Sequence, residues 1–538
     1  MKLLKLLLES KTKFALYLFG AFLTIATGIF STLALANAFS IIEESEPKQI
    51  QVKILLAATF ALTPVILQTI SRLLRIGFMR EVLYKVRIQA FLKIINLDIA
   101  SYKEKTYENY FANLVSDINL FESDFFLSLL NIVFAFGSFL VGILILVYLA
   151  PLVAIITFVT ALLLFIITKI FEKPLQKQQT KILEANVDYN QNLTNNLNGL
   201  EIISLYHVQA YFKQNFSAMI AVLEQIKQGS FKLKEFQHNL NNWLASSIQI
   251  LTYIYATYLY VNQKLSLTEL IIIFNLVGQL IWSMISGFSF INRIKVANQV
   301  YLKITEAPQV LDATLQFNYH DKLTIKNLTF NYQNQNIISN LSLEINPLDK
   351  VLIIGDSGSG KTTLLNILTK TLNDYQGEIF FDKQSLKEID PISLYQKIGY
   401  IRQNHFLFEA SIKDNIILNQ AYDEEKFNNI LKQLKIFDWI NTLENQANHL
   451  LTNNGTNVSG GQRQLISIAR ELYADKEILL VDEPAASLDD YSAKQVYQAL
   501  VKLDKTIFCV SHHHHNYLKK YFNKVISFEE TGQIYETI

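Results

Sequence analysis

The feature that most constrains this chain is a long run without a single charged residue, Phe125–Thr168. A helix of about 20 apolar residues crosses the hydrocarbon core of a bilayer, so the run is about long enough for two crossings. Ala150 and Pro151 lie near its middle, where a proline suits the end of one helix and the first turn of the next. The run therefore predicts two consecutive membrane-spanning helices.

Four more uncharged runs lie in the first part of the chain, at Phe14–Ile42, Ile54–Ser71, Leu240–Gln263 and Leu270–Asn292. Each is long enough to cross a bilayer. Half of the residues are hydrophobic and only 18% are charged, which is typical of a membrane protein that also carries a soluble part. We predict an all-α transmembrane domain over residues 1–300, with six helices at about residues 14–42, 52–75, 125–148, 151–171, 240–263 and 268–292.

The charged residues around the first helix predict its orientation. Four basic residues precede it and place the N-terminus in the cytoplasm by the positive-inside rule: Lys2, Lys5, Lys11 and Lys13. The long inner connections, roughly 72–124 and 169–239, are polar with helical patterns, so we expect them to extend the membrane helices. The N-terminus also resembles a secretory signal, but its uncharged run exceeds a signal's apolar core, so we expect a retained helix.

From about Lys322, short β-rich runs alternate with helical patterns, which indicates an α/β domain at residues 322–538 after a linker at 301–321. The strand Val351–Ile354 leads into GDSGSGKT, which fits the phosphate loop G-x-x-x-x-G-K-[ST]. Backbone N–H groups of such a loop surround phosphates, Lys361 reaches the β- and γ-phosphates, and the Thr362 hydroxyl binds Mg²⁺. The predicted nucleotide-binding residues here are Gly355, Asp356, Ser357, Gly358, Ser359, Gly360, Lys361, Thr362 and Thr363.

A second apolar strand, Ile478–Val481, ends in the acid pair Asp482 and Glu483. In open α/β folds, an acid at the carboxyl end of a strand lies beside the phosphate loop. We predict Asp482 as a ligand in the Mg²⁺ shell and Glu483 as the catalytic group that polarises the attacking water. A solvated acid or a second metal ligand is the alternative for Glu483.

The stretch Ser459, Gly460, Gly461 and Gln462 is a second glycine-rich segment, followed by a helical pattern at Arg463–Tyr473. A helix start offers free N–H groups and the positive end of the dipole, which suits a phosphate. No lysine follows the glycines, so this is not a second phosphate loop. We predict that it completes the γ-phosphate site of an ATP held by another copy, so that two copies sandwich two ATPs.

The order of GDSGSGKTT, Gln403, VSGGQ, ILLVDEP, SLD and SH resembles the nucleotide-binding domain of ABC transporters, and the six-helix half resembles that of an ABC exporter half-transporter. The resemblance implies that Tyr332 stacks on adenine, although an ordinary strand aromatic is the alternative. It implies that Gln403 contacts Mg²⁺ and the membrane domain. It also implies that Asp489 acts across the dimer and that His512 is the catalytic switch histidine at the γ-phosphate.

Some features depart from the family pattern or stay open. Val458 stands where the signature usually has leucine, and LTNNGTN lacks the acidic residues that many exporters carry there. The run His513–His515 is either a solvated turn or a helix start, or it binds metal.

The resemblance implies ATP-driven export by a dimer, with ATP and Mg²⁺ as cofactors and a second half-transporter, identical or different, as partner. The chain would lie in the plasma membrane, crossing the lipid bilayer several times, with its N-terminus and ATPase domain in the cytoplasm. Residues 198–206 and 103–114 resemble the coupling regions that dock beside the Q-loop. A membrane ATPase with a sensing or regulatory role is the alternative.

Composition limits the other classes. Lys+Arg (48) and Asp+Glu (47) nearly cancel, so we expect no nucleic-acid partner. One cysteine excludes an internal disulfide framework. No peptidase-like segment precedes the first helix, so self-processing peptide export is not expected, and the Asn- and Lys-rich usage suggests a bacterial source.

A stripe at helical spacing marks the last predicted membrane helix: Asn275, Gln279, Trp282, Ser286 and Phe290. These residues either line a cavity for an amphipathic cargo or join neighbouring helices through polar contacts. The uncharged runs contain no Asp, Glu, Lys, Arg or His, so a site for charged cargo at mid-membrane is not indicated.

Overall fold

The computed structural model describes residues 2–103, 105, 107–306, 315–332, 335–403, 405–511, 515–528 and 534–537. Its contacts divide the chain into two compact units. The first unit comprises Met1–Lys93 and Tyr107–Glu306, and the second comprises Ile94–Thr106 and Ala307–Ile538. The short segment Ile94–Thr106 lies within the range predicted for the transmembrane domain, yet it groups with the second unit.

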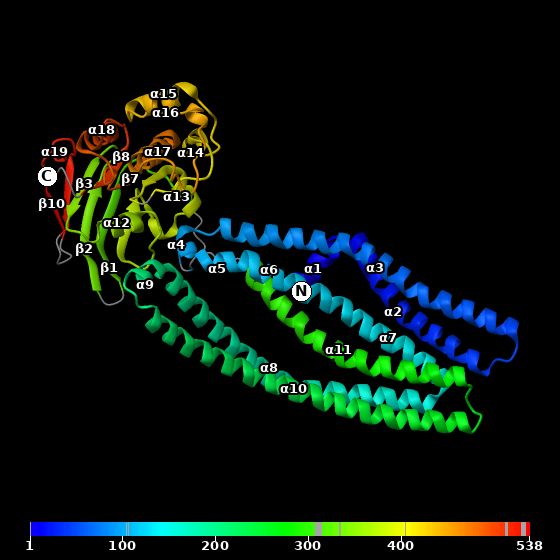
Figure 1. Ribbon diagram of the computed structural model, residues 1–538. Coiled ribbons are helices and arrows are strands. Elements are labelled where there is room, and N and C mark those ends of the chain that lie inside the picture. The colour runs from blue at the N-terminus through cyan, green and yellow to red at the C-terminus, as the bar shows by residue number, and fades with distance from the viewer. Residues whose placement is uncertain are drawn as a thin grey trace. The chain divides into compact units, whose positions relative to one another are not determined.

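The first unit consists of helices, several of them long and side by side (Figure 1). Their bounds are α1 (Lys2–Glu9), α2 (Lys11–Ser40), α3 (Pro47–Ile95), α5 (Tyr107–Ala112), α6 (Ile118–Phe121), α7 (Leu127–Leu149), α8 (Pro151–Asn198), α9 (Leu200–Leu205), α10 (Gln209–Val261) and α11 (Leu267–Thr305). Pro151 occupies the first turn of α8, as its place in the sequence predicts. Helices α3, α8 and α10 continue well beyond the uncharged runs.

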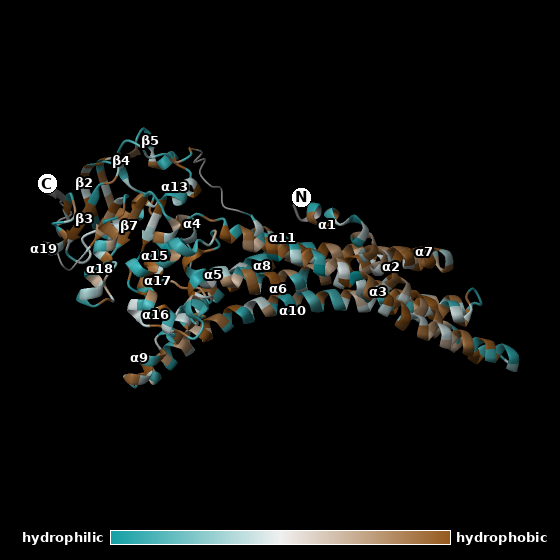
Figure 2. Ribbon diagram, turned by 90° about the horizontal axis from the view of Figure 1, so that it is seen from above, coloured by the Kyte–Doolittle hydropathy of each residue, from teal (hydrophilic) through white to brown (hydrophobic). Residues whose placement is uncertain are grey.

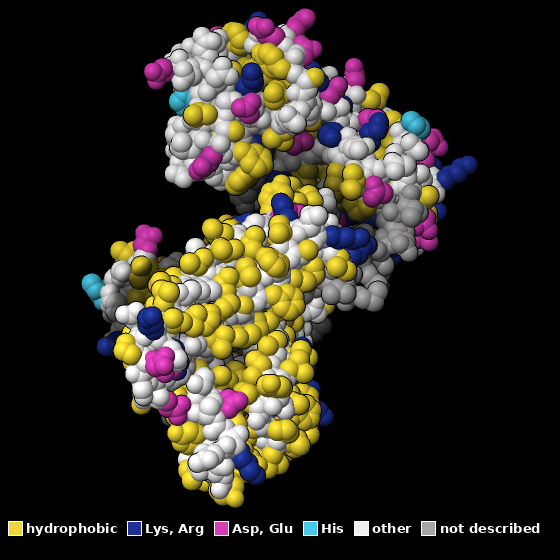
Figure 3. Space-filling view, turned by 90° about the vertical axis from the view of Figure 1, so that its right-hand side faces the viewer, with side chains coloured by type: hydrophobic (Ala, Val, Ile, Leu, Met, Phe, Trp, Pro, Cys, Tyr) yellow, Lys and Arg dark blue, Asp and Glu magenta, His cyan; other side chains and the backbone are white. Residues whose placement is uncertain are grey.

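Five segments of the described chain are long and apolar enough to cross a membrane: Lys11–Glu43, Pro47–Ile95, Asn109–Leu149, Pro151–Asn198 and Leu267–Thr305. Hydrophobic residues are prominent along these helices (Figure 2), and their side chains cover much of the visible face of the helical unit (Figure 3). The predicted span at residues 240–263, the fifth in chain order, lies mostly in α10 and is not among the five. Its uncharged part carries Asn241, Asn242 and Gln249, which lower its hydropathy. Helix α10 nevertheless packs along α8.

Polar contacts join α2 to α11 within this unit. The Thr32 hydroxyl donates to Asn275 Oδ1 at 2.8 Å. Gln279 lies so close to Gly28 that a Cβ there would be 2.3 Å from the amide nitrogen. In lipid, small residues and side-chain hydrogen bonds hold helices together. For Asn275 and Gln279 the structure therefore supports the helix-packing interpretation of the stripe.

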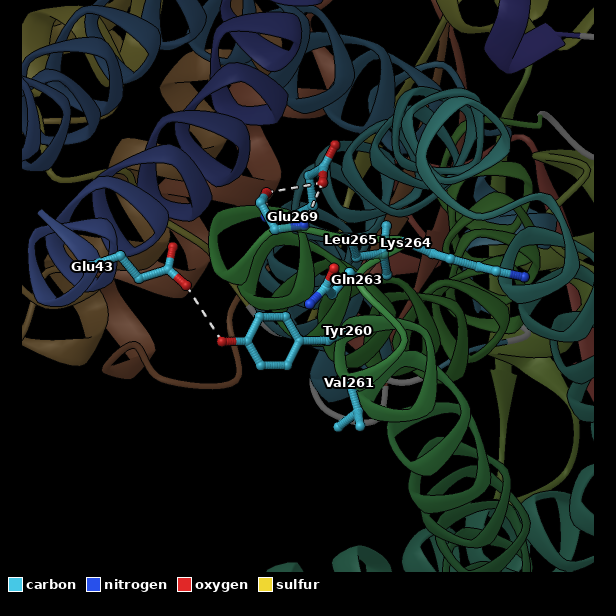
Figure 4. Close-up of a pocket in the computed structure, with 8 residues that line it drawn as sticks. Glu43, Tyr260, Val261, Gln263, Lys264, Leu265 and Glu269 are labelled. Atoms are coloured by element: carbon cyan, nitrogen blue, oxygen red, sulfur yellow. Dashed lines mark hydrogen bonds between the residues drawn. The ribbon is translucent and has the colours of Figure 1, made fainter.

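An open pocket of about 600 Å³ lies at the loop between α10 and α11. The Tyr260 hydroxyl donates to Glu43 Oε1 at 3.3 Å, and Glu269 forms a capping box with Ser266 at the start of α11 (Figure 4). Glu43 ends the short helical turn η1 (Ile41–Glu43) after α2. The bond thus ties the end of α2 to the end of α10.

The second unit contains two sheets. A four-stranded antiparallel sheet has the order β2 (Gln335–Ile345), β1 (Leu323–Tyr332), β4 (Gln376–Phe381) and β5 (Gln384–Ser385). A six-stranded sheet has the order β10 (Ile534–Thr537), β9 (Lys524–Phe528), β3 (Lys350–Gly355), β8 (Thr506–Val510), β7 (Ile478–Asp482) and β6 (Ile398–Ile401). Only β10 pairs antiparallel in this sheet.

Helices surround the six-stranded sheet, which is consistent with the predicted α/β class (Figure 1). The helices of the second unit are α4 (Ile99–Lys103), α12 (Lys361–Leu368), α13 (Pro391–Lys397), α14 (Ile412–Ile417), α15 (Glu424–Gln433), α16 (Phe437–Thr442), α17 (Gly460–Ala474), α18 (Asp490–Val501) and α19 (His515–Leu518).

The central strands β7 and β8 are buried over their whole length, which explains their unbroken apolar sequences. Their side chains alternate between two apolar cores. Leu479 and Val481 enter the core with α14, α15 and α17, whereas Ile478 and Leu480 enter the core with α12 and the antiparallel sheet. This sandwich fixes the carboxyl ends of β3 and β7, where the motifs lie.

Candidate nucleotide-binding site

The phosphate loop joins β3 to α12, and two of its glycines are required by the backbone. Gly360 has φ +101°, and a Cβ there would lie 2.7 Å from Ile337 Cγ2 on β2. Gly355 has φ +148°, and its Cβ would lie 2.3 Å from the Phe528 carbonyl oxygen. A side chain at either position would be strained and would clash. The motif glycines therefore let two neighbouring strands close onto the loop.

Lys361 is buried and points back into this loop. Its ammonium donates to the carbonyl oxygens of Gly355 at 2.9 Å and Asp356 at 2.6 Å. Burial lowers the pKa of Lys361, while the carboxylates of Glu483, Asp356 and Asp482 favour its charged form. The ammonium is thus held where the loop surrounds a phosphate.

Asp482 lies beside the loop at the end of β7, as the sequence predicts. The Thr362 hydroxyl donates to Asp482 Oδ2 at 2.9 Å. Burial raises the pKa of Asp482, and the neighbouring Glu483 raises it further. A hydroxyl and a carboxylate so close together are hard oxygen ligands that suit Mg²⁺, which usually takes few protein ligands beside water and phosphate oxygens. No group of three or more His, Cys, Asp or Glu that could hold a metal ion is found among the described residues.

Glu483 follows β7 in a left-handed backbone conformation, with φ +51°. Such a conformation is unusual for glutamate and is typical of functional sites. The Gln403 amide donates to Glu483 Oε2 at 3.0 Å, and the Glu483 N–H donates to the Val510 carbonyl at 3.1 Å. The structure therefore brings the Q-loop glutamine to the predicted catalytic acid. No hydrogen bond from Gln403 to Thr362 or Asp482 is found among the described residues.

The glycine pair of the second motif belongs to a helix rather than to a loop. Helix α17 begins at Gly460, three residues earlier than predicted, because Ser459 and Gln462 form a capping box. The Gln462 N–H donates to Ser459 Oγ at 3.2 Å, and the Ser459 N–H donates to Gln462 Oε1 at 2.9 Å. The pattern S-x-x-Q is a known signal for a helix start. A Cβ on Gly461 would lie 3.0 Å from Leu488 Cδ2, so α17 starts against the segment before α18.

Gln464 is a further residue of the site that the motif analysis missed. It is wholly buried on α17. Its amide donates to the Glu483 carbonyl at 3.2 Å, and its Oε1 accepts from the Ser487 N–H at 3.2 Å. Gln464 thereby joins α17 to the segment that carries Glu483, the predicted catalytic residue. The signal was a polar residue on the apolar side of a helical pattern, which is buried only when its hydrogen bonds are satisfied.

The remaining predicted site residues differ in their exposure and in their contacts. Asp489 is exposed and caps α18 by accepting from the Ser492 N–H at 2.6 Å, which lowers the pKa of its carboxyl. Tyr332 is 49% exposed at the end of β1, with its ring edge-on to Phe330. His512, His513 and His514 lie outside the described residues, as does the side chain of His515.

The short helix α4 lies within the second unit, near the Q-loop. Burial lowers the pKa of Lys103, and Arg402, the neighbour of Gln403, lowers it further. Burial also lowers the pKa of Lys370, whereas the Asp98 carboxylate opposes this shift. The first of the two regions predicted to couple the domains was residues 103–114. The segment that groups with the second unit begins earlier, at Ile94, and ends at Thr106.

Two family models match the chain. The one described as "ABC transporter transmembrane region" matches residues 14–284, about half of the chain, and the one described as "ABC transporter" matches residues 338–486. The chain belongs to the ABC transporters. It carries the transmembrane and ATP-binding regions of this family in one polypeptide, in the order of an exporter half-transporter, and is a multi-pass membrane protein.

Several known proteins are similar to this ABC transporter. It is 25% identical to the SPbeta prophage-derived sublancin-168-processing and transport ATP-binding protein SunT of Bacillus subtilis over 68% of this chain and 53% of that protein. It is 35% identical to an ATP-dependent lipid A-core flippase of Francisella tularensis over 34% of this chain and 30% of the flippase. The chain spans about half the length of SunT.

A solved structure shares the fold. The structure of a bacterial Atm1-family ABC exporter with ATP bound has a TM-score of 0.81 to this chain. The match covers 96% of this chain and 93% of the exporter chain. Their sequences are 17% identical. The likeness confirms the predicted architecture of a helical transmembrane domain followed by an α/β nucleotide-binding domain.

Proposed function

We propose that this ABC transporter is one half of a dimeric exporter that hydrolyses ATP in two composite sites. One observation carries the proposal. The phosphate loop, Asp482 and Glu483 lie together in one chain, whereas the exposed Ser459 at the start of α17 bonds only with Gln462 among the described side chains. A second copy placed head to tail would bring this positive helix end to the γ-phosphate of the first.

The residues have distinct tasks in the proposed hydrolysis. Lys361 and the loop N–H groups hold the phosphates, and Tyr332 stacks on the adenine. Glu483, oriented by Gln403, accepts a proton from the water as its oxygen attacks the γ-phosphorus and the bond to ADP breaks. Thr362 and Asp482 would hold Mg²⁺, which neutralises phosphate charge.

Coupling to transport would use α4 and α9. Helix α4 already belongs to the second unit. Helix α9 exposes apolar side chains, with Leu200 at 56%, Ile202 at 61% and Leu205 at 70%. We infer that α9 docks on a nucleotide-binding domain, because exposed apolar side chains clustered on one helix are typical of an interaction site. Closure of the ATP sandwich would then bias the membrane helices outward.

The proposed place is the plasma membrane, with the N-terminus and the nucleotide-binding unit in the cytoplasm. The fused arrangement of both regions favours export. The relatives named for sublancin-168 processing and transport and for lipid A-core flipping support an amphipathic cargo as the proposed class.

Complementation between two inactive variants tests the composite site. Lys361→Ala removes the phosphate-loop ammonium, and Ser459→Arg blocks the helix start. Each variant alone should fail to trap nucleotide with vanadate. A co-expressed mixture should recover about a quarter of wild-type trapping, because half of the dimers are mixed and each of these has one intact site. No recovery in demonstrably mixed dimers would contradict the proposal.

A further inference from the structure

Three cations on the inner part of α11 differ in how they are paired. The Lys295 ammonium lies 2.6 Å from Glu172 Oε1, and that of Lys303 lies 2.7 Å from Asp117 Oδ2. Arg293 Nη1 lies 4.0 Å from Asp124 Oδ1, at the limit of an ion pair. The guanidinium instead lies 5.3 Å from the centre of the Phe290 ring. Arg293 is therefore the cation on this helix whose charge is least engaged by a carboxylate.

Arg293 also continues the stripe that the sequence analysis found on this helix. The residues of the extended stripe follow one another at steps of three or four along the helix: Asn275, Gln279, Trp282, Ser286, Ser289 and Arg293. Residues so spaced share one helix face. The outer members contact α2, whereas Trp282, Ser286, Ser289 and Arg293 are exposed. The inner half of the stripe is thus exposed on the single chain and ends in a guanidinium directly after the uncharged run.

The chemistry of this surface selects a class of ligand. A guanidinium binds phosphate or carboxylate in a bidentate manner, and stacking on an aromatic ring leaves its N–H groups free to do so. Trp282 lies eleven residues away, about 16 Å along the helix, and offers an apolar surface. The helix between Trp282 and Arg293 carries no charged side chain, so it suits the apolar chain of a ligand and not a second charged group.

We propose that Arg293 and Phe290 recognise the anionic head of an amphipathic cargo whose apolar part lies along α11 toward Trp282. The proposal rests on the proposed export function and names the cargo class. Without cargo, the Asp124 carboxylate lies beside the Arg293 guanidinium, and the phosphate or carboxylate of the cargo takes its place there. It is a binding and specificity assignment, separate from the hydrolytic residues.

Trp282 provides a direct readout of binding. In the full-length protein with Trp243→Phe and Trp439→Phe, Trp282 is the remaining tryptophan. In nanodiscs of zwitterionic lipid without ATP, dodecyl phosphate, 1-dodecylglycerol and dodecyltrimethylammonium are each titrated against its fluorescence. We expect the phosphate probe to act at about tenfold lower concentration than the neutral one. Equal responses to all three probes would overturn the proposal.

Variants then assign the selectivity to its residues. Arg293→Gln should abolish the preference for the phosphate probe, and Arg293→Lys should retain part of it. Asp124→Asn should strengthen it, because the competing anion is removed. Lys295→Gln, on the same helix, should leave it unchanged. A preference that survives Arg293→Gln in protein whose Trp282 still responds to the neutral probe would refute the assignment.

Two further experiments distinguish an amphipathic ligand from free phosphate, and binding from transport. Inorganic phosphate should not displace dodecyl phosphate at equal concentration, and full displacement would refute an amphipathic ligand. ATP-dependent movement of dodecyl phosphate is measured in proteoliposomes. Selective binding without movement would count against export while supporting the anion site, whereas equal movement of neutral and anionic probes would count against the anion site alone.

Discussion

The two units bury their apolar residues to very different extents. Every residue of β7 and β8 in the nucleotide-binding unit is buried, whereas none of the most apolar window of α3 is buried within the transmembrane unit. Water drives apolar side chains into the first kind of core, but lipid does not drive them inward. Small residues and polar contacts therefore supplement the apolar clusters in the packing of the transmembrane unit, whereas the nucleotide-binding unit buries polar groups such as Lys361, Asp482 and Gln464 beside its sequence motifs.

The largest expected effect concerns chemistry in the nucleotide-binding unit. Glu483→Gln keeps the size of the side chain but removes the base, so ATPase activity should fall by about 10²–10⁴-fold. Binding of a fluorescent ATP analogue should persist, because the phosphate loop is intact. Wild-type turnover in this variant would remove Glu483 from the catalytic role.

The comparison of cores can be tested with one type of substitution in each unit. Leu480→Ala, at a fully buried position, should destabilise the nucleotide-binding unit by about 2–5 kcal/mol. Leu55→Ala, at a position 69% exposed on α3, should change stability by less than about 0.5 kcal/mol. Pulse proteolysis of the detergent-solubilised protein measures both. Similar losses in the two variants would break the contrast.

Gln464 tests whether a buried polar group links the signature helix to the catalytic segment. Gln464→Leu has similar volume but leaves the Glu483 carbonyl and the Ser487 N–H without this partner, which should cost about 1–3 kcal/mol. ATPase activity should fall together with thermal stability. Gln433→Leu is the control at an exposed position, where the amide bonds only the Ala499 carbonyl among the described residues, and it should cost less.

In the transmembrane unit a comparable polar contact should matter less. Thr32→Val removes the hydrogen bond to Asn275 while keeping the shape, and such bonds average about 0.6 kcal/mol in membranes. Steric-trap unfolding in bicelles is sensitive enough to measure this. A loss above 2 kcal/mol would show that polar contacts dominate the packing of these helices.

A pH dependence is also expected in the nucleotide-binding unit. Burial, with Arg463 and Arg470 nearby, lowers the pKa of His405 to about 4. The unfolded chain takes up this proton near pH 6.5, so the folded state loses stability as pH falls from about 6.5 toward 4. His405→Gln should show a smaller drop in Tm than wild type between pH 7.5 and 5.5. The two should change in parallel between pH 8.5 and 7.5, and equal drops at acidic pH would contradict the shift.

Much of the nucleotide site was predictable from the sequence because its determinants are local. A strand, a glycine-rich turn and a helix start follow one another in the phosphate loop, and Asp482 and Glu483 directly follow a strand. The start of α17 was placed too late, although the S-x-x-Q pattern at Ser459 was present. A capping box depends on two side chains in one helical turn, so this signal was also local.

The sequence by itself determined the apolar spans, the α/β domain and the phosphate loop, since each depends on residues close together in the chain. Only the tertiary structure decided that Asn275 and Gln279 contact α2, that Gln464 holds Glu483 and Ser487, and that α4 groups with the second unit. These contacts join residues that are distant in sequence. Which neighbouring helix or strand a polar side chain contacts depends on how whole helices and sheets pack. The physical reason is that short-range geometry fixes a motif, whereas burial and partner choice are fixed by the assembled core.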